Sequence, residues 1–599
     1  MITNPPTTLT EIFFGAVDRY SSKRAALRYK SAGRWHNVTH HEVARAVRHA
    51  AIGLRELGVE RGAHIGILSE NRPEWVVADF ACLALGCADV PIYPTLPGHQ
   101  IAYILNDSGA RTVFVENAEQ LAKLEAIRDE IPDLEHLIVF DHEPDMTGAG
   151  ILPYKDLLRQ GQGSEAKYPT YRDDALSAQP SDVATLIYTS GTTGPPKGVM
   201  LSHGNFTSNV LGALTVLPLT AGDSCLSLLP LSHSFERMAG HYTMIQAGVT
   251  INYAESIDQV PANLQEVRPT IVLSVPRLFE KIYARVLENA LAGGAVKRRI
   301  FFWARRNAER WADLKLAGQA IPGGLALKKA VADRLVFSKL QARTGNRVRF
   351  FISGGAPLNP EIAKFFYAAG LPILEGYGLT ETSPVITVNS LEELRLRSVG
   401  RPIPGVEVRI AEDGEIFTRG PNVMQGYYER PDATREAIDA DGWFHTGDIG
   451  ELDDGFLRIT DRKKDIIVTA GGKNIAPQPI ENKVKANTFV LNAVMVGDRR
   501  RFPIMLVVPN QEAVKQWAGK RNLAVDPADL LNMPDVVAKI ETEVMGTLRD
   551  LASYEMPKKL LLLENDFTIE GGELTPTLKV KRRIVEEKHK ARIDALYKA

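Results

Sequence analysis

The sequence predicts an α/β fold with two unequal domains, and three observations lead to this prediction. Strand-like apolar runs alternate with helical patterns through the first part of the chain, which indicates largely parallel sheets covered by helices. Five charged residues, Asp461 to Asp465, then interrupt the apolar pattern. A chain of 599 residues is also too long for one hydrophobic core. We therefore expect a large domain over residues 1–461 and a small α+β domain over 462–599.

The expected elements follow from local patterns. Thr39 and Glu42 have the spacing of a capping box, so a helix should begin directly after Thr39. Apolar runs bounded by polar residues indicate the strands. In chain order we expect a strand at 64–68, a helix at 74–85, strands at 88–93, 111–115, 184–188 and 348–352, then strands at 490–496 and 504–508, and a charged last helix after Lys579.

The composition is that of an ordinary globular protein, with 44% hydrophobic and 24% charged residues. The formal net charge of −1 gives no overall bias toward nucleic acid, so nucleic acid is not an expected partner. Cys82, Cys87 and Cys225 have apolar surroundings in the sequence and form no C-x-x-C motif, so buried reduced thiols are expected. No secretory signal opens the chain and no apolar run approaches the ~20 residues of a membrane span, so we expect a cytoplasmic protein.

A segment rich in glycine and hydroxyl residues follows the expected strand at 184–188. Backbone N–H groups and hydroxyls in such a loop can hold phosphate oxygens, and a lysine adds a positive charge. The order of residues fits neither G-x-x-x-x-G-K-[ST] nor G-x-G-x-x-G. We expect phosphate oxygens to be bound by Thr189, Ser190, Gly191, Thr192, Thr193, Gly194 and Lys197.

This loop resembles the signature of the AMP-forming adenylating enzymes, which include acyl-CoA synthetases, adenylation domains of peptide synthetases and firefly luciferase. Further segments of the chain resemble other motifs of that family, in the same order. They are Ser353–Leu358, Glu375–Thr382, Trp443–Asp448 and Leu574–Arg583. The resemblance therefore covers most of the chain and implies ATP as a substrate, with Mg²⁺ as cofactor.

The resemblance also implies a nucleotide pocket. Asp448 matches the ribose-binding position, where a carboxylate can accept hydrogen bonds from both ribose hydroxyls, and Arg462 matches its usual partner. Tyr377 would stack on the adenine. The residues implied to form the adenine pocket are Gly355, Ala356, Pro357, Glu375, Gly376, Tyr377 and Gly378.

Catalytic and metal-binding roles are implied in the same way. Glu381 beside Thr380 suits magnesium, which takes few protein carboxylates and several oxygens from phosphate or water. In the family this glutamate holds the metal, assisted by a hydroxyl of the first loop, here Thr189. The adenylation lysine matches Lys579; Leu578 stands where the family usually has glycine, which leaves Lys581 as a rival.

Three further positions follow from the resemblance. Lys464 matches the hinge about which the small domain turns. The loop of Gly471, Gly472 and Lys473 matches the one that meets the pantetheine arm of coenzyme A. His233 matches the histidine lining the acyl pocket, although a purely structural histidine is nearly as well supported.

Within the family, the chain looks most like bacterial long-chain fatty acid–CoA ligases. Pro230–Arg237, Val275–Lys281 and a helical insertion near 290–345 carry this resemblance. It implies that a fatty acid and ATP give acyl-AMP and diphosphate, and that coenzyme A then takes the acyl group. The alternatives are a fatty acyl-AMP ligase that loads a separate carrier protein, and a nucleotide-binding scaffold without catalysis. A scaffold is expected to lose Lys579 or Glu381, and this chain has both.

The region from Lys297 to Arg349 is strongly basic, with 14 Lys or Arg against three Asp or Glu. One interpretation is a solvated helical face over aromatic packing. The other is a surface for the phosphates of a large ligand or for anionic lipid on the inner face of the membrane, with arginines on both sides of an aromatic run. The residues proposed for it are Phe301, Phe302 and Trp303 with Arg298, Arg299, Arg305 and Arg306. The sequence gives no indication of an oligomeric state.

Overall fold

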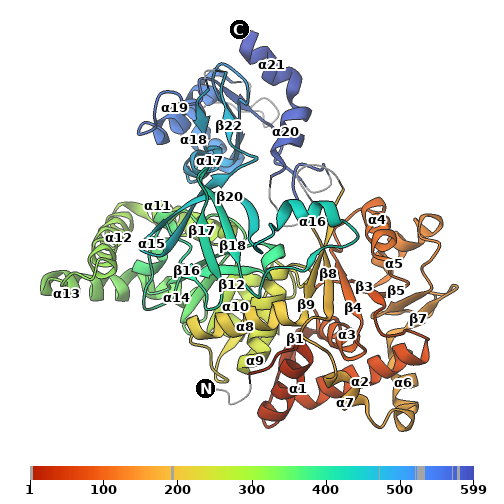
Figure 1. Ribbon diagram of the computed structural model, residues 1–599. Coiled ribbons are helices and arrows are strands. Elements are labelled where there is room, and N and C mark those ends of the chain that lie inside the picture. Colours follow the sequence, from red (N-terminus) through yellow and green to blue (C-terminus); the bar gives the residue numbers. More distant parts are fainter. Residues whose placement is uncertain are drawn as a thin grey trace.

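The predicted α/β fold is confirmed (Figure 1). The computed structural model describes residues 5–189, 195–470, 472–519, 521, 533–568, 571–575 and 580–598. Two large, mostly parallel sheets lie side by side at the base of the molecule, and a smaller unit containing the last helices lies above them. Cys82, Cys87 and Cys225 are free and buried, as predicted.

An eight-stranded sheet is formed mainly by the first part of the chain. Its strand order is β19-β9-β8-β4-β3-β5-β6-β7, parallel from β8 to β7 and antiparallel at the β9 and β19 edge. The strands are β3 (His64–Leu68), β4 (Ala88–Ile92), β5 (Thr112–Val115), β6 (His136–Val139), β7 (Ile151–Pro153), β8 (Val183–Thr189), β9 (Lys197–Ser202) and β19 (Gly426–Tyr427).

Helices cover this sheet because their apolar faces need partners. The capping box at Thr39 and Glu42 is present and starts α2, as predicted. The helices of this region are α1 (Leu9–Tyr20), α2 (His40–Glu56), α3 (Pro73–Ala84), α4 (Gly98–Ser108), α5 (Ala118–Glu125), α6 (Tyr154–Gly163) and α7 (Tyr171–Leu176).

A nine-stranded sheet follows, in the order β16-β15-β14-β13-β12-β10-β11-β1-β2. Its centre is parallel, and the carboxyl ends of β13 and β14 lead directly into two of the predicted motifs. The strands are β1 (Leu27–Ser31), β2 (Arg34–Val38), β10 (Ser224–Ser227), β11 (Thr250–Tyr253), β12 (Ile271–Ser274), β13 (Phe350–Ser353), β14 (Ile373–Gly378), β15 (Val385–Val388) and β16 (Arg401–Pro402). Its helices are α8 (His203–Val216), α9 (Thr243–Ala247), α10 (Val260–Val267) and α15 (Pro360–Ala368).

A fully buried ion cluster ties the two sheets together. Arg237 lies in the π-helical segment η3 (Glu236–Tyr242), which follows β10. Its guanidinium pairs with Asp79 of α3 at 2.6 Å and with Asp89 of β4, and all three side chains are 0% exposed. It also donates to the hydroxyl of Thr185 in β8 at 2.8 Å. A charge this deep is tolerated because it is paired and fully hydrogen-bonded.

The helical insertion projects from one side of the nine-stranded sheet, where α12 and α13 extend away from the rest of the molecule (Figure 1). It consists of α11 (Pro276–Ala292), α12 (Gly294–Leu316), α13 (Gly323–Ala332), η4 (Asp333–Phe337) and α14 (Ser338–Arg343). No helix among the described residues is long and apolar enough to cross a membrane.

An antiparallel sheet in the order β17-β18-β20-β21 leads toward the C-terminal unit. Its strands are β17 (Glu407–Ile410), β18 (Glu415–Arg419), β20 (Phe444–Asp453) and β21 (Phe456–Arg462), with α16 (Pro431–Ala437) before β20. We call the remainder, from Ile467 onward, the small domain and everything before it the large domain. The exact boundary at residue 461 stays a prediction.

The small domain has its own apolar core, because two clusters of buried residues draw all their members from Ile467 onward. The predicted last helix is two helices that meet at His589. The elements are β22 (Ile467–Val468), β23 (Asn474–Ile475), α17 (Pro477–Lys485), β24 (Val490–Val496), β25 (Ile504–Pro509), α18 (Gln511–Gly519), α19 (Pro534–Thr547), β26 (Leu560–Leu562), α20 (Arg582–Lys588) and α21 (Lys590–Lys598).

Candidate functional site

The two described ends of the glycine-rich segment meet in the β8–β9 hairpin. Thr189, the last residue of β8, is the cross-strand partner of Lys197, the first residue of β9. The hairpin register therefore brings a hydroxyl and an ammonium together at the edge of the eight-stranded sheet. Ser190, Gly191, Thr192, Thr193 and Gly194 lie outside the described residues.

Tyr427 joins this hairpin to the predicted metal ligand, and the sequence analysis missed it. Strand β19 pairs with β9, so Tyr427 lies opposite Val199. The ammonium of Lys197 lies 4.9 Å from the centroid of the Tyr427 ring, within the range of a cation–π contact. The Tyr427 hydroxyl donates to Oε1 of Glu381 at 3.0 Å. The Tyr-Tyr pair after Gly426 was the only sequence signal for it.

Glu381 and Thr380 lie on the short turn η5 (Thr380–Thr382), directly after β14. The Thr380 hydroxyl is 3.4 Å from the hydroxyl of Ser234, which belongs to the Pro230–Arg237 segment. These groups offer only oxygen ligands, as magnesium prefers. The described residues contain no group of three or more His, Cys, Asp or Glu able to hold an ion. One carboxylate with hydroxyls nearby thus fits a Mg²⁺ ion that arrives with the phosphates of ATP.

The Gly354–Leu358 loop is held open beside this turn. The backbone at Gly355, Ala356 and Pro357 is exposed, and Gly355 has a φ of +81°, which favours glycine. Oε1 of Glu375 accepts a hydrogen bond from the backbone N–H of Leu358 at 3.0 Å. Burial raises the pKa of Glu375 to about 7. Its carboxyl group thus holds the loop in position.

Glycine is also required behind the predicted adenine pocket. A Cβ atom at Gly378 would lie 1.7 Å from the backbone oxygen of Pro384, and one at Gly376 would lie 3.3 Å from that of Thr387. These glycines let β14 and β15 approach closely. The close approach keeps Tyr377, between them, at the edge of the site.

Tyr377, Asp448 and Arg462 meet, although they come from three strands. The Tyr377 hydroxyl donates to Oδ2 of Asp448 at 2.7 Å, and Nε of Arg462 lies 3.2 Å from Oδ1. The register of β20 and β21 makes Asp448 and Arg462 direct cross-strand partners. Burial lowers the pKa of Arg462, but Asp448 and other neighbours, Glu381 among them, more than offset this and raise it. The Arg462 guanidinium thus pairs with Asp448, in a position where the charge of Glu381 also acts on it.

The structure does not bring the remaining predicted residues into this cluster. Lys464 is exposed, and the residue before it is anchored: Lys463 Nζ lies 2.7 Å from Glu415 and 2.6 Å from Asp413. Gly472 and Lys473 are exposed, and the Lys473 ammonium lies 5.8 Å from the ring centroid of Tyr554 in the small domain. Gly471 and Lys579 lie outside the described residues.

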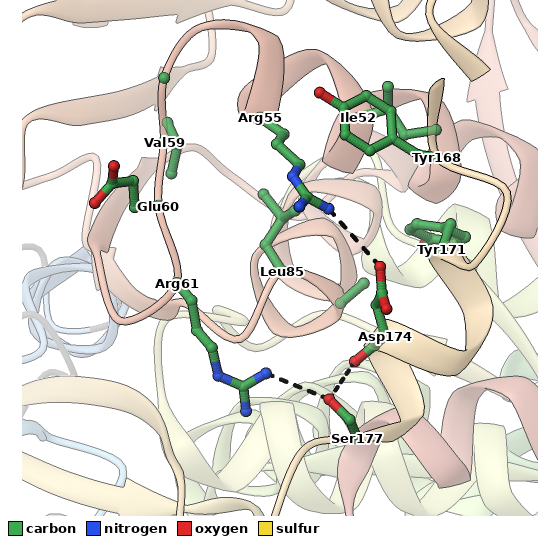
Figure 2. A pocket seen from close by; sticks show the side chains of 12 residues that line it. Ile52, Arg55, Val59, Glu60, Arg61, Leu85, Tyr168, Tyr171, Asp174 and Ser177 are labelled. Carbon is green, nitrogen blue, oxygen red and sulfur yellow. Dashed lines mark hydrogen bonds and ion pairs between the residues drawn. The ribbon is translucent and has the colours of Figure 1, made fainter. Parts of the chain in front are cut away.

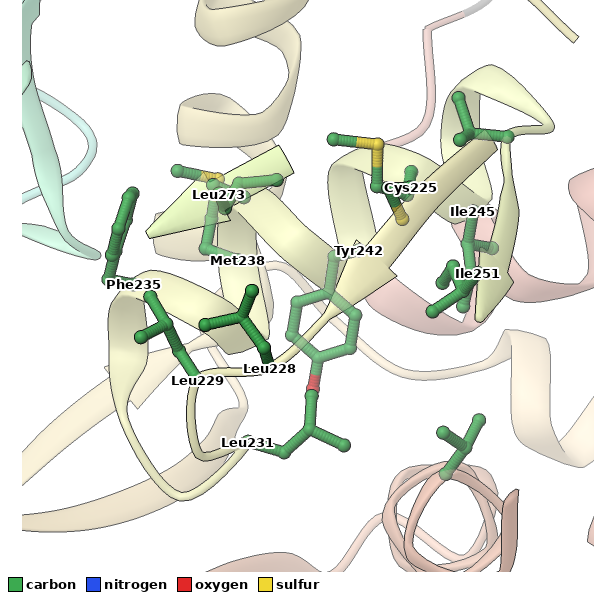
Figure 3. Close-up of a cluster of buried hydrophobic side chains, with 14 of the residues drawn as sticks. Cys225, Leu228, Leu229, Leu231, Phe235, Met238, Tyr242, Ile245, Ile251 and Leu273 are labelled. Atoms are coloured by element: carbon green, nitrogen blue, oxygen red, sulfur yellow. The ribbon is translucent and has the colours of Figure 1, made fainter. Parts of the chain in front are cut away.

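His233 lies in the Pro230–Arg237 segment, next to a cluster of apolar side chains. Its Nδ1 accepts a hydrogen bond from the backbone N–H of Phe235 at 3.1 Å, which orients the ring. The Phe235 ring would lie 3.1 Å from a Cβ atom at Gly354, so the apolar cluster borders the predicted adenine loop. Figure 3 shows side chains of this cluster, to which the Pro230–Arg237 segment itself contributes: Leu228, Leu229, Leu231, Phe235, Met238 and Leu273.

A cavity of about 600 Å³ lies elsewhere, between α2, α3 and α7. Arg55 and Arg61 line it, but Arg55 lies 3.8 Å from Asp174 and Arg61 donates to Ser177 at 3.4 Å (Figure 2). None of the predicted site residues lines this cavity. Its size alone therefore does not make it the candidate site.

Known proteins resemble this chain over most of its length. The family described as AMP-binding enzyme matches residues 13–428, and the AMP-binding enzyme C-terminal domain matches residues 464–599. The long-chain-fatty-acid–CoA ligase FadD15 of Mycobacterium tuberculosis is 40% identical, over 94% of this chain and 93% of its own length. The peroxisomal long chain acyl-CoA synthetase 6 of Arabidopsis thaliana is 35% identical, over 94% of this chain and 81% of its own.

Solved structures share the fold at lower identity. The anthranilate CoA ligase AuaEII, in complex with anthranoyl-AMP, has a TM-score of 0.73 at 20% identity, with 98% of this chain and 99% of that chain covered. The adenylation domain of a carboxylate reductase from Mycobacterium chelonae has a TM-score of 0.74 at 23% identity, with 100% and 92% covered. The family matches and the relatives of nearly full length lead to one conclusion: the chain belongs to the AMP-binding enzyme family.

Proposed function

We propose that this enzyme is an ATP-dependent ligase that joins long-chain fatty acids to coenzyme A. The observation that carries the proposal is the contact of Asp448 with both Tyr377 and Arg462, which sets a carboxylate able to accept ribose hydroxyls beside an aromatic ring and a guanidinium. Relatives with 40% and 35% identity over most of the chain are named as long-chain ligases or synthetases, which supports the substrate class.

The reaction has two steps. A carboxylate oxygen of the fatty acid attacks the α-phosphorus of ATP, and the bond to the β-phosphate oxygen breaks, giving acyl-AMP and diphosphate. The sulfur of coenzyme A then attacks the acyl carbon, its thiol proton is lost, and AMP departs. The net products are acyl-CoA, AMP and diphosphate, and no covalent enzyme intermediate is required.

The site residues divide between binding and charge stabilisation. Asp448 would accept the ribose hydroxyls, Tyr377 would cover the adenine, and Lys197 with the 189–194 segment would hold the phosphates. Lys579 would stabilise the charge that develops between carboxylate and α-phosphate. Glu381 and the Thr189 hydroxyl would hold Mg²⁺, which when bound neutralises charge on the departing phosphates. His233 and the apolar cluster next to it would line the acyl side.

The small domain would turn between the two steps. Lys463 is anchored to Glu415 and Asp413, so Lys464 is the first residue free to act as a hinge. The exposure of Gly472 and Lys473 supports assigning this orientation to the adenylation step, before the turn that would bring their loop to coenzyme A. Lys464→Pro should spare adenylation and lower thioester formation sharply, since proline fixes φ near −65°. Normal thioester synthesis by that variant would show that Lys464 is not the hinge residue.

The second candidate is an acyl-AMP ligase that loads a carrier protein, because the adenylating site is the same. A screen of diphosphate release over acids of increasing length, with and without coenzyme A, separates these functions. We expect turnover to rise with chain length and to require coenzyme A, with acyl-CoA as product. Acyl-AMP that accumulates and resists coenzyme A would favour the carrier-loading enzyme. If no acid causes diphosphate release, the remaining function is a nucleotide-binding scaffold without catalysis.

The substrate suggests a membrane partner, and we propose an anionic bilayer at the inner face. Seven of the 13 large apolar side chains that are exposed in the described chain fall between residues 291 and 335. On α13 and η4, Leu327, Val331 and Leu335 follow a spacing of four, which puts them on one helical face. We call this set the insertion surface: Leu291, Val296, Ile300, Phe302, Leu327, Val331 and Leu335.

Charge complementarity supports the bilayer as partner. Among the described residues between Lys297 and Arg334, eight basic side chains have no ion pair, and each adds about 1 kcal/mol near an anionic membrane. They are Lys297, Arg298, Arg299, Arg306, Arg310, Lys315, Lys328 and Arg334. Two residues of the sequence-based proposal are wrong for this purpose. Arg305 pairs with Glu309 at 2.6 Å, and Phe301 is buried.

Vesicle flotation tests the insertion surface. The enzyme should bind vesicles containing phosphatidylglycerol at low salt, less at 0.5 M salt, and little with phosphatidylcholine alone. Val296→Glu with Leu327→Glu should abolish binding, whereas Arg45→Gln with Arg397→Gln, two exposed arginines elsewhere, should not. Equal vesicle binding by all variants would contradict the proposal that the insertion surface binds the membrane. If the enzyme self-associates and the Val296→Glu, Leu327→Glu variant does not, the insertion surface binds a second copy of the chain instead of a membrane.

A further inference from the structure

The start of helix α11 contacts the small domain through an ion pair that the proposed reaction does not yet use. Nη2 of Arg277 lies 3.4 Å from Oδ2 of Asp566, a residue 289 positions away in the sequence. Arg277 belongs to the Val275–Lys281 segment of the large domain, and Asp566 follows β26 of the small domain. The pair therefore spans the two parts that must move relative to each other.

The small-domain side of this contact is fixed in advance. Oδ1 of Asp566 accepts hydrogen bonds from the Asn492 side chain at 3.0 Å and from the backbone N–H of Phe567 at 2.9 Å. Asn492 is buried in β24. With Oδ1 occupied, Oδ2 is oriented toward the guanidinium of Arg277. The carboxylate thus loses little side-chain freedom when the two domains meet.

Glu280, one helical turn further along α11, carries a charge opposite to that of Arg277. Burial raises the pKa of Glu280, and the charge of Lys485 on α17, followed by that of Arg277, opposes this rise. The large domain thus presents a cation and then an anion, and the small domain presents an anion and then a cation. Such an alternating arrangement favours one register between two surfaces.

The contact is also close to the nucleotide site. Val275, the residue before α11, has a methyl group that would lie 3.8 Å from a Cβ atom at Gly355 in the predicted adenine loop. Arg277 is two residues further on. The same segment therefore borders the adenine loop at one end and the small domain at the other.

We propose that Arg277 and Asp566, supported by Glu280 and Lys485, form a latch that holds the small domain in the adenylating orientation and opens when the domain turns. The inference rests on the proposed two-step function. A partly exposed ion pair contributes little to overall stability. Both orientations must be populated in each catalytic cycle, however, so a small difference in free energy changes their ratio.

The two half-reactions test the latch separately. Asp566→Asn and Arg277→Gln should each lower acyl-AMP formation about two- to fivefold relative to thioester formation from supplied acyl-AMP, because an exposed pair is weak. Arg277→Lys, which keeps the positive charge, should retain most of the ratio. Lys281→Gln, an exposed neighbour on the same helix, should leave it unchanged. Equal loss in both half-reactions, or a loss in Arg277→Lys as large as in Arg277→Gln, would assign these residues a structural role only.

Spin labels give a readout that does not depend on activity. The three native cysteines are buried, so labels can be attached selectively at Arg285→Cys on α11 and Arg549→Cys in the small domain. In the ligand-free full-length protein, Asp566→Asn should broaden the distance distribution and add a second population. A distance distribution that is unchanged in Asp566→Asn would contradict the proposed latch. If the enzyme instead adenylates no fatty acid, the proposed function fails while the label distances still decide the latch.

Discussion

Tyr427 and Glu381 are joined by a hydrogen bond of 3.0 Å from the tyrosine hydroxyl to Oε1 of the carboxylate. The same tyrosine ring lies under the ammonium of Lys197. One side chain thus orients both the proposed phosphate-binding lysine and the proposed metal ligand. Removal of its hydroxyl should affect the metal side alone.

Tyr427→Phe is expected to lower acyl-AMP formation about tenfold, since hydrogen bonds to charged groups contribute about 1.5–3 kcal/mol. The ring remains over Lys197, so phosphate binding should change little. The Mg²⁺ concentration for half-maximal rate should rise. The measurement is diphosphate release against Mg²⁺ at saturating ATP, with Tyr428→Phe as the neighbouring control. An unchanged Mg²⁺ dependence would show that Tyr427 does not support metal binding.

Asp448→Asn is expected to raise the KM for ATP about tenfold or more, because it weakens the acceptor for the ribose hydroxyls. The decisive comparison uses 2′,3′-dideoxy-ATP, which lacks those hydroxyls. The variant and the unmodified enzyme should then differ little. If the KM ratio is the same for both nucleotides, Asp448 supports the fold and does not contact ribose.

Lys579→Ala is expected to abolish acyl-AMP formation and to spare thioester formation from supplied acyl-AMP, because the lysine acts only on the first transition state. Lys581→Ala is the matched control and should keep both activities. Assays of each half-reaction decide the point. If Lys581→Ala shows the selective loss instead, the adenylation lysine is Lys581.

Arg237→Met is expected to destabilise the large domain by about 3–5 kcal/mol, because it leaves Asp79 and Asp89 buried without a counterion. Chemical denaturation followed by tryptophan fluorescence measures this. Arg458→Met, which breaks a surface pair with Glu451 at 2.8 Å, should change stability by less than about 1 kcal/mol. Similar small effects at both positions would mean that the buried carboxyl groups are neutral.

His203 should make the protein sensitive to acid. Burial lowers its pKa to about 4, and its Nδ1 accepts a hydrogen bond from the backbone N–H of Leu9 at 3.2 Å. The unfolded chain therefore binds a proton near pH 6.5 and the folded chain does not, so stability is lost as the pH falls from 6.5 toward 4. His203→Gln should flatten the decline of melting temperature across that range. If the melting temperature of the variant declines as steeply as that of the unmodified protein, other titratable groups cause the acid sensitivity.

The parts of the fold that local sequence patterns determine were predicted well. The capping box at Thr39 and the strands at 64–68 and 490–496 are present. Side-chain pairs between distant segments were not predictable, because no local pattern specifies them. Tyr427 and Glu381 are 46 residues apart, and Arg237 and Asp79 are 158 apart.

The basic insertion illustrates the same limit. Its composition predicted a charged surface, but helix orientation decides which side chains face water. Phe301 is buried because of how α12 packs against α13 and α15. The ion pair of Arg305 with Glu309 is a local i,i+4 contact within α12, and the sequence analysis overlooked it. Within the site, the register of β20 and β21 confirms that Asp448 and Arg462 are neighbours. Their proposed contact with ribose stays a prediction.

The most direct test of the central claim follows an oxygen isotope. A long-chain fatty acid labelled with ¹⁸O in its carboxylate is incubated with the enzyme, ATP, Mg²⁺ and coenzyme A, and the products are analysed by mass spectrometry. If the carboxylate attacks the α-phosphorus, one ¹⁸O atom appears in AMP and the other stays in acyl-CoA. Unlabelled AMP, or ADP in place of AMP, would contradict an adenylating ligase.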